Sequence, residues 1–238
     1  MKAIILAAGI GVRLHPMSSD KPKSLIEIGG KALLDYQIDA LIECNIKDIV
    51  ITTGHLERKI REYVARKYPF LNVAYVYNPE YDTTNYIYSM WLARELIDDD
   101  LILIHGDLVF NEKLLVNMVN SNYENCVLVS RKAKPESKDF KAVVENNKVI
   151  KIGVEFFGEN VLDSLPMYKL SRSDYLCWLQ EIDKFIKNGS KGSYAEDAFN
   201  NISDKIILRP LYFNEEFGME IDTKEDFKMA KNILKNRL

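Results

Sequence analysis

The sequence is poor in cysteine, has no strong excess of either charge and contains no long hydrophobic run. Its three cysteines, Cys44, Cys126 and Cys177, lie far apart, and none belongs to a CxxC pair. This usage is typical of a reduced, cytoplasmic protein without a structural zinc site. No apolar stretch approaches the roughly 20 residues of a membrane-spanning helix, so we expect no membrane partner. The apolar run 2–8 stops at Gly9 without a cleavage-like region, which favours a buried strand over a signal peptide.

The charge balance is nearly even. The chain of 238 residues has 32 Lys and Arg against 35 Asp and Glu, a formal net charge of −3. Proteins that coat nucleic acid are strongly basic, so this balance argues against nucleic acid as a partner. An anionic substrate would have to be held by a few well-placed cations. The hydrophobic share of 47% is enough for a complete core, and we expect one domain over residues 1–238.

Strand and helix patterns alternate regularly through the first half of the chain. The expected strands are 2–8, 48–53, 72–77 and 101–104, and the expected helices are 32–44, 55–67 and 85–97. Such alternation predicts parallel βαβ units, hence an α/β fold with a mostly parallel, Rossmann-like sheet flanked by helices.

The second half of the chain is less regular. We expect a small antiparallel insertion, in which strands 142–145 and 149–154 form a hairpin that turns at Asn146-Asn147-Lys148. The other expected strands are 126–131 and 205–212, and the expected helices are 174–187, 194–201 and 223–238. The closing helix would place Phe227, Ala230, Ile233 and Leu234 on one face.

Four loop segments follow the expected parallel strands. They are 9–23, 53–55, 78–85 and 106–107. Ligands of parallel α/β sheets bind beyond the carboxyl ends of the strands, so these segments should converge on one binding face.

The first of these segments combines glycines with two cations. Gly9 and Gly11 directly follow a buried strand, and their N–H groups could face phosphate oxygens. A dinucleotide fingerprint would need a third glycine where Leu14 stands, and no P-loop motif is present. Arg13 and Lys23, the latter stiffened by the preceding proline, would suit a triphosphate clamp. A tight turn within a solvated basic loop is the alternative interpretation.

The motif LAAGxGxRL followed by KPKxL resembles the signature of the nucleotidyltransferases, which include sugar-1-phosphate nucleotidylyltransferases and small cytidylyltransferases. The resemblance implies that the glycine loop and Arg13 bind a nucleoside triphosphate and that Lys23 contacts the phosphates at the reacting centre, so that Arg13 and Lys23 are the catalytic residues. The implied nucleotide-binding residues of the loop are Leu6, Ala8, Gly9 and Gly11.

The resemblance also implies a magnesium site. Asp107, which follows the 101–104 strand and a glycine, and Asp222, in an IDTxxD setting, match the metal-binding aspartates of the family. Carboxylate oxygens suit Mg²⁺ that bridges phosphates. Capping of the closing helix is the alternative role for Asp222.

The segment 78–89 resembles the phosphocholine cytidylyltransferase branch of the family. There it lines the base and ribose pocket, which implies nucleotide-binding roles for Asn85 and Ser89, with Gly54 and His55 near the base. Both polar residues could instead cap the helix that begins at Asn85.

The acceptor side is implied by a YxED element at 194–197. Tyrosine rings and carboxylates can hold an ammonium group, which points to Tyr194, Glu196, Asp197 and Glu220, with Tyr86 and Tyr168 as further cage walls. Lys141 could meet the acceptor phosphate, and Arg131 and Lys132 an acceptor carboxylate. Core packing and helix capping are the alternatives for Tyr194 and Glu196.

The implied enzyme is a magnesium-dependent cytidylyltransferase. It would transfer CMP from CTP to a phosphocholine- or 2-aminoethylphosphonate-type metabolite and release pyrophosphate, for the decoration of surface glycans or lipids. Residues 1–125 would form a nucleotide-binding half and residues 126–238 an acceptor-binding half. A sugar-1-phosphate uridylyl- or thymidylyltransferase, a phosphoglutamine cytidylyltransferase and a regulatory nucleotide-binding module remain alternatives, and a homodimer is left open.

Overall fold

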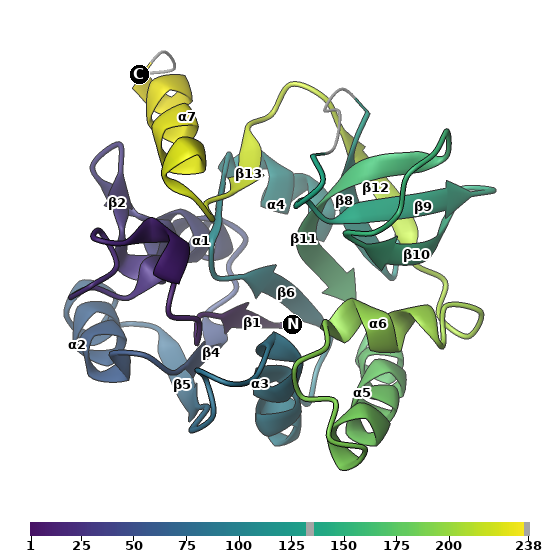
Figure 1. Ribbon diagram of the computed structural model, residues 1–238, viewed down its shortest axis with the longest axis horizontal. Coiled ribbons are helices and arrows are strands. Elements are labelled where there is room, and N and C mark those ends of the chain that lie inside the picture. Colours follow the sequence, from purple (N-terminus) through teal and green to yellow (C-terminus); the bar gives the residue numbers. More distant parts are fainter. Residues whose placement is uncertain (132–135, 236–238) are drawn as a thin grey trace.

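Within the part of the chain that the structure describes, the core is a nine-stranded sheet in which four neighbouring strands are parallel. The computed structural model describes residues 1–131 and 136–235 (Figure 1). The parallel strands lie in the order β6-β1-β4-β5. Their bounds are β1 (Lys2–Leu6), β4 (Asp48–Thr53), β5 (Asn72–Tyr77) and β6 (Leu101–His105). The α/β fold with a mostly parallel central sheet, predicted from the alternating pattern, is confirmed.

Both faces of β1, β4 and β6 are buried, which explains their mostly apolar sequences, whereas the edge strand β5 is only partly buried. In β1, Ala3 and Ile5 face one hydrophobic cluster, whereas Ile4 and Leu6 face the other. The first cluster is covered by α1 (Leu33–Glu43), α2 (Glu57–Lys67) and α4 (Glu112–Val119). The second is covered by α3 (Tyr86–Ala93), α5 (Arg172–Lys187) and α6 (Ala195–Asn200). When both faces of a sheet are covered, the side chains on both sides of a strand are apolar, and the strand does not alternate between polar and apolar residues.

Strand β11 (Val161–Leu170) joins the parallel part of the sheet to the second half of the chain. It pairs antiparallel with β6, with β8 (Cys126–Ser130) and with β9 (Lys141–Glu145). The sequence analysis missed this strand because it contains Pro166 and an irregular mixture of polar and apolar residues. The structure accommodates the proline at a register shift between Leu165 and Tyr168.

The expected hairpin is confirmed as β9 and β10 (Lys148–Gly153). Asn146 and Asn147 take φ values of 49° and 58°, the left-handed conformations that a tight two-residue turn requires. Strand β12 (Arg209–Phe213) begins four residues later than expected and pairs parallel with β8.

The C-terminal segment returns to the N-terminal part of the molecule. Helix α7 (Lys224–Lys235) lies near the hairpin of β2 (Glu27–Ile28) and β3 (Lys31–Ala32), yellow beside purple in Figure 1. Its apolar face of Phe227, Ala230, Ile233 and Leu234 packs in the cluster that holds Ile28. Residues 236–238, the end of the expected helix, lie outside the described residues. Just before α7, β13 (Gly218–Glu220) pairs antiparallel with β7 (Leu108–Phe110).

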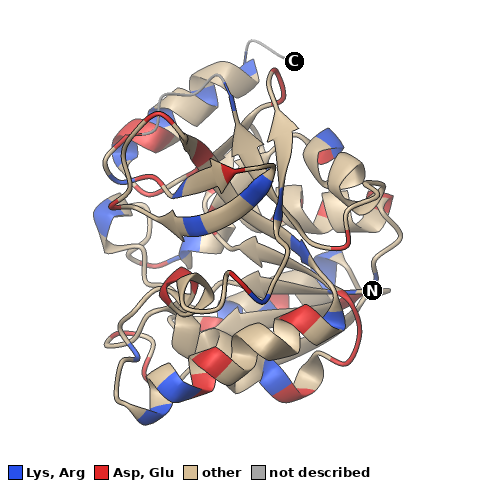
Figure 2. Cartoon of the chain, turned by 90° about the vertical axis from the view of Figure 1, so that its right-hand side faces the viewer, with Lys and Arg blue, Asp and Glu red and all other residues tan. Residues whose placement is uncertain are grey.

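Charged side chains of both signs are distributed over the surface. Figure 2 shows Lys and Arg interspersed with Asp and Glu along the outer helices, in keeping with the nearly even charge balance. Over the described parts of the chain, every helix is too short or too polar to cross a bilayer.

Candidate active site

A cavity of about 500 Å³ opens at the carboxyl ends of the parallel strands. Three of the four segments that were expected to converge there line it, and the fourth, around Gly54, packs behind them. From the second half of the chain come Lys138, Phe140, Val154, Tyr194, Glu220 and Asp222. Of the residues implied by the family resemblance, the cavity is lined by Leu6, Ala8, Gly9, Gly11, Arg13, Lys23, Asn85, Tyr86, Asp107, Tyr194, Glu220 and Asp222.

The glycine loop brings the stem of Lys23 against the backbone of Gly11. Gly11 has a φ of 71°, and a Cβ there would lie 3.0 Å from Cβ of Lys23. The Ser18 hydroxyl donates to the Gly11 carbonyl oxygen at 2.7 Å. Leu14, at the place of a third glycine, is fully buried in the cluster that also holds Ile28. The leucine therefore anchors the loop in the core, where a dinucleotide fingerprint would need a glycine.

Lys23 connects the two aspartates that were assigned to the metal. Its Nζ lies 2.7 Å from Oδ2 of Asp107 and 2.6 Å from Oδ1 of Asp222. Arg13 reaches the other oxygen of Asp222, with Nη2 to Oδ2 at 3.0 Å. The Lys23 side chain is 13% exposed and that of Arg13 is 60% exposed, so the lysine belongs to the floor of the cavity and the arginine to its mouth.

A short ladder places Asp222 beside Asp107. β13 pairs with β7 so that Glu220 stands opposite Leu108, and the Ile221 amide donates to the Asp107 carbonyl oxygen at 3.0 Å. Backbone hydrogen bonds directly beside both residues therefore bring Asp107 and Asp222 together, although the two lie far apart in the sequence.

The donor groups around Asp107 fit a divalent cation. Among the described residues, His105, Asp107 and Glu220 offer ligand atoms that lie within 4.8 Å of one another. Oδ1 of Asp107 is buried and has no hydrogen-bond partner, which leaves an acceptor available. Hard carboxylate oxygens of this kind favour Mg²⁺ over softer metals.

The ionisable groups of the site lie close enough together to shift one another's pKa values. Burial works against the charge on Lys23, but Asp107 and Asp222 outweigh it and hold the lysine pKa above its usual value. Burial likewise disfavours ionised Asp107, yet the Lys23 charge keeps the pKa of this carboxyl low. Burial and the neighbouring aspartates raise the pKa of Glu220 well above its usual range. Added positive charge would therefore stabilise the ionised form of Glu220.

Glu196 lies below the cavity wall. It is fully buried, and its Oε1 accepts a hydrogen bond from the Tyr168 hydroxyl at 2.7 Å while its Oε2 accepts one from Tyr86. Glu196 thus fixes Tyr86, whose ring lines the cavity at 6.0 Å from that of Tyr194. In this arrangement the carboxylate positions an aromatic wall and does not face the cavity.

His105 was not singled out from the sequence. It lines the cavity and is 5% exposed, with its ring centroid 4.4 Å from that of Tyr86 and 5.9 Å from that of Phe140. Its Nε2 lacks a hydrogen-bond partner. A lone histidine at the end of a buried strand carries little sequence signal, although its place two residues before Asp107 could have suggested it.

The two polar residues of the 78–89 segment lie at different depths. Asn85 lines the cavity and caps α3, because its Oδ1 accepts from the Tyr86 amide at 2.8 Å. Ser89 is buried one turn into the helix, where its hydroxyl accepts a hydrogen bond from the side chain of Asn78 at 3.1 Å. Asn78 itself lines the cavity, so Ser89 supports the wall from behind.

Gly54 allows two cavity segments to meet. A Cβ at this position would lie 2.5 Å from the Ala8 carbonyl oxygen and 2.5 Å from Cβ of Tyr81. Since Ala8 and Tyr81 both line the cavity, any side chain here would push the glycine loop and the 78–85 segment apart. The neighbouring His55 ring lies 6.0 Å from that of Tyr81.

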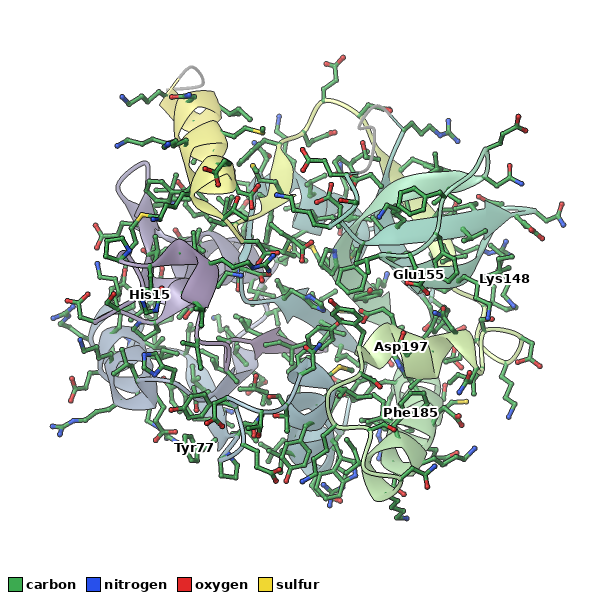
Figure 3. The ribbon with its side chains drawn as sticks, viewed as in Figure 1. His15, Tyr77, Lys148, Glu155, Phe185 and Asp197 are labelled. Atoms are coloured by element: carbon green, nitrogen blue, oxygen red, sulfur yellow. The ribbon has the colours of Figure 1, made fainter. Side chains whose placement is uncertain are left out.

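Asp197 and Lys141 are engaged in contacts outside the cavity. Asp197 accepts from the Tyr194 amide at 2.9 Å at the start of α6, and it lies close to Glu155 (Figure 3). Lys141 is fully buried, and its Nζ donates to the carbonyl oxygens of Asp139 and Val154 at 2.8 and 2.7 Å. Lys141 is therefore unavailable to an acceptor in this arrangement.

Lys138, three residues earlier, lines the cavity instead. The sequence analysis did not single it out, because nothing in the pattern of this lysine-rich segment distinguishes one lysine from another. Arg131 stacks on Tyr212, with its guanidinium 3.7 Å from the ring centroid. Lys132 lies outside the described residues.

We expect the stability of the protein to depend on pH because of Asp163, a carboxyl group near Lys141. Burial, with the charge of Asp139, raises the pKa of Asp163 to about 7. In the unfolded chain the pKa is about 3.9, so between these values the folded state holds more protons and stability falls as pH rises. We expect Asp163→Asn to raise stability at pH 8 by roughly 1–3 kcal/mol and to change it little at pH 4. Urea unfolding at both pH values, with the exposed Asp204→Asn as control, measures this, and an equal effect at both would contradict it.

Residues 2–169 match the model of a family described as nucleotidyl transferase. The chain belongs to the nucleotidyl transferase family. It is an enzyme of this family, and its relatives include cytidylyltransferases.

Two relatives align with the chain over almost its whole length. The chain is 30% identical to a choline-phosphate cytidylyltransferase of Streptococcus pneumoniae, with 99% of each protein covered. It is 31% identical to a CTP:phosphoglutamine cytidylyltransferase of Campylobacter jejuni, with 93% of each covered. The two identities are nearly equal, so overall similarity does not select one acceptor.

A third relative is a phosphonate enzyme, and the fold is shared with a solved structure. The chain is 35% identical to a CMP-5'-(3-aminopropyl)phosphonate synthase of Streptomyces rubellomurinus over 57% of its own length, which spans 22% of that protein. The solved structure of the CTP:phosphocholine cytidylyltransferase LicC from Streptococcus pneumoniae superposes with a TM-score of 0.79 at 25% identity, covering 98% of both chains.

Proposed function

We propose that this nucleotidyltransferase transfers CMP from CTP to a small phosphorylated or phosphonate metabolite of the phosphocholine or 2-aminoethylphosphonate type. The observation that carries the proposal is the cavity in which Arg13 and Lys23 face Asp107 and Asp222 at the carboxyl ends of the parallel strands. The choice of CTP is supported by the three cytidylyl relatives.

The nucleotide-binding half, residues 1–125, supplies the triphosphate site. The glycine loop would offer backbone N–H groups, and Arg13 at the mouth and Lys23 on the floor would neutralise the phosphates. Asn78, Thr84 and Asn85 line the same cavity and would offer amide and hydroxyl groups to the base and ribose. Amide groups of this kind can read the donor and acceptor pattern of a pyrimidine.

The acceptor-binding half, residues 126–238, supplies a wall suited to a cationic group. Tyr86, which Glu196 fixes from this half, faces Tyr194, and Phe140 packs edge-on against Tyr194 at 5.1 Å between ring centroids. The His105 ring lies between this wall and Glu220. It packs against Tyr86, and its Nδ1 is 3.9 Å from Oε1 of Glu220. Aromatic faces together with a carboxylate attract an ammonium group.

The proposed reaction forms one bond between an acceptor oxygen and the α-phosphorus of CTP and breaks the bond from that phosphorus to the pyrophosphate. The acceptor oxygen is anionic near neutral pH, so no general base is required. Catalysis would rest on positioning the two substrates and on neutralising charge as pyrophosphate leaves, the role of Lys23 and Arg13. When bound by Asp107 and Asp222, Mg²⁺ would polarise the phosphate oxygens.

A pyrophosphate-release screen tests the proposal. It combines each of CTP, UTP, ATP, GTP and dTTP with each of phosphocholine, 2-aminoethylphosphonate, phosphoglutamine and glucose-1-phosphate in the presence of Mg²⁺. We expect release with CTP and either phosphocholine or 2-aminoethylphosphonate, whereas release with CTP and phosphoglutamine alone would favour the phosphoglutamine cytidylyltransferase alternative. Turnover with UTP or dTTP and glucose-1-phosphate, without any CTP pair, would replace the proposal by a sugar nucleotidyltransferase. Nucleotide binding without release in any pair would indicate a regulatory module.

A further inference from the structure

The cavity walls carry three cations among the described residues, Arg13, Lys23 and Lys138. Arg13 and Lys23 come from the N-terminal segment and both contact Asp222. Lys138 comes from the connection between β8 and β9, in the other half of the chain. The three charges therefore reach the cavity from two sides.

Lys138 is held at the edge of the cavity by a carboxylate that has other partners. Its Nζ pairs with Oδ1 of Asp226, and its side chain is 32% exposed. The other oxygen of Asp226 accepts the amides of Asp222 and Thr223 at 3.0 and 2.8 Å. If Lys138 turned toward a ligand, Asp226 would keep both backbone hydrogen bonds and would not be left as an unpaired buried carboxylate.

The reaction requires charge neutralisation on the acceptor side as well. An anionic phosphate that approaches a triphosphate meets strong repulsion unless cations lie between or beside the two. Arg13 and Lys23 lie in the glycine loop and would already be paired with the triphosphate. Lys141 cannot serve, because its ammonium is fully buried against carbonyl oxygens.

We propose that Lys138 binds the phosphate or phosphonate group of the acceptor and positions its oxygen for attack, an inference that rests on the proposed function. In the structure Lys138 pairs with Asp226, and the acceptor anion would replace or share this partner. The pair also joins Lys138 to the segment that carries Asp222, because the other oxygen of Asp226 accepts the Asp222 amide.

The test compares steady-state constants of three lysine variants, using whichever of phosphocholine, 2-aminoethylphosphonate or phosphoglutamine supports wild-type turnover. Lys138→Met should raise the acceptor KM at least about tenfold, a loss of about 1.4 kcal/mol, and leave the CTP KM within about twofold. Lys138→Arg should recover most of the acceptor affinity. Lys148→Met, at the outer end of β10 in Figure 3, is the matched control and should behave as wild type.

Three outcomes would overturn the assignment of Lys138. They are an unchanged acceptor KM in Lys138→Met, an equal rise of both KM values, or the same kinetic profile in Asp226→Asn, which would mean that the lysine acts by holding Asp226. Wild-type turnover separates this proposal from the proposed function. A wild type that is inactive with CTP contradicts the function, whereas an active wild type with an unaffected Lys138→Met contradicts the lysine assignment.

Discussion

Asp107→Asn should lower turnover at least about a thousandfold at saturating CTP and Mg²⁺ while the protein stays folded. Asparagine keeps the shape of the side chain but removes the charge that pairs with Lys23 and the oxygen pair suited to a hard cation. Lys23 retains Asp222 at 2.6 Å, so the buried ammonium is not left without a partner. The loss should therefore appear in kcat more than in the fold.

Pyrophosphate release and circular dichroism measure the two parts of this expectation. Asp82→Asn is the matched control, because Asp82 is exposed and lies in the 78–85 segment without lining the cavity. It should keep near-wild-type turnover. A near-normal rate for Asp107→Asn in saturating CTP and Mg²⁺ would refute the assignment of Asp107 as a metal ligand.

Lys23→Met should have two large effects of opposite sign. Turnover should fall at least about a hundredfold, because a charge that neutralises the phosphates is lost. Affinity for a free divalent cation, in the absence of nucleotide, should rise about tenfold or more. In the structure the Lys23 ammonium occupies the space between Asp107 and Asp222, at 2.7 and 2.6 Å, so lysine and a metal ion compete for the same oxygens.

Calorimetric titration with Mn²⁺ measures the affinity for the free cation directly. Lys21→Met, in the same loop, is the control. Without metal, Lys23→Met should unfold at a lower temperature, since two partly buried carboxylates lose their shared cation, and added Mn²⁺ should restore much of the difference. Metal affinity that is equal in wild type and Lys23→Met would show that the ammonium does not exclude the ion.

The parallel part of the fold was predictable because its signals are local. Each strand is a short, mostly apolar run followed by a glycine or an asparagine, and the helices between them carry apolar residues at helical spacing, so neither required knowledge of distant contacts. β11 was missed for the opposite reason. Pro166 and the polar residues of this strand become compatible with a sheet only through a register shift that neighbouring strands tolerate.

The site was predictable where a motif fixes the spacing and unpredictable where side-chain direction decides. Arg13 and Lys23 lie in one loop that Leu14 anchors in the core, and they line the cavity together. Lys141 and Lys138 are separated by three residues, yet the first turns into the protein and the second into the cavity. Glu196 looked like a binding carboxylate, but its burial against two tyrosine hydroxyls depends on contacts from three elements.

The short ladder between β7 and β13 has a consequence for the order in which the molecule is made. A ribosome that has released residues 1–217 has already supplied the parallel sheet, the glycine loop and Asp107, but not Glu220 or Asp222. If Asp222 acts as proposed, nucleotide chemistry at this cavity must wait until the β13 segment has emerged and docked against β7. On the proposed mechanism, a nascent chain therefore cannot consume nucleotide before β13 and Asp222 have been made.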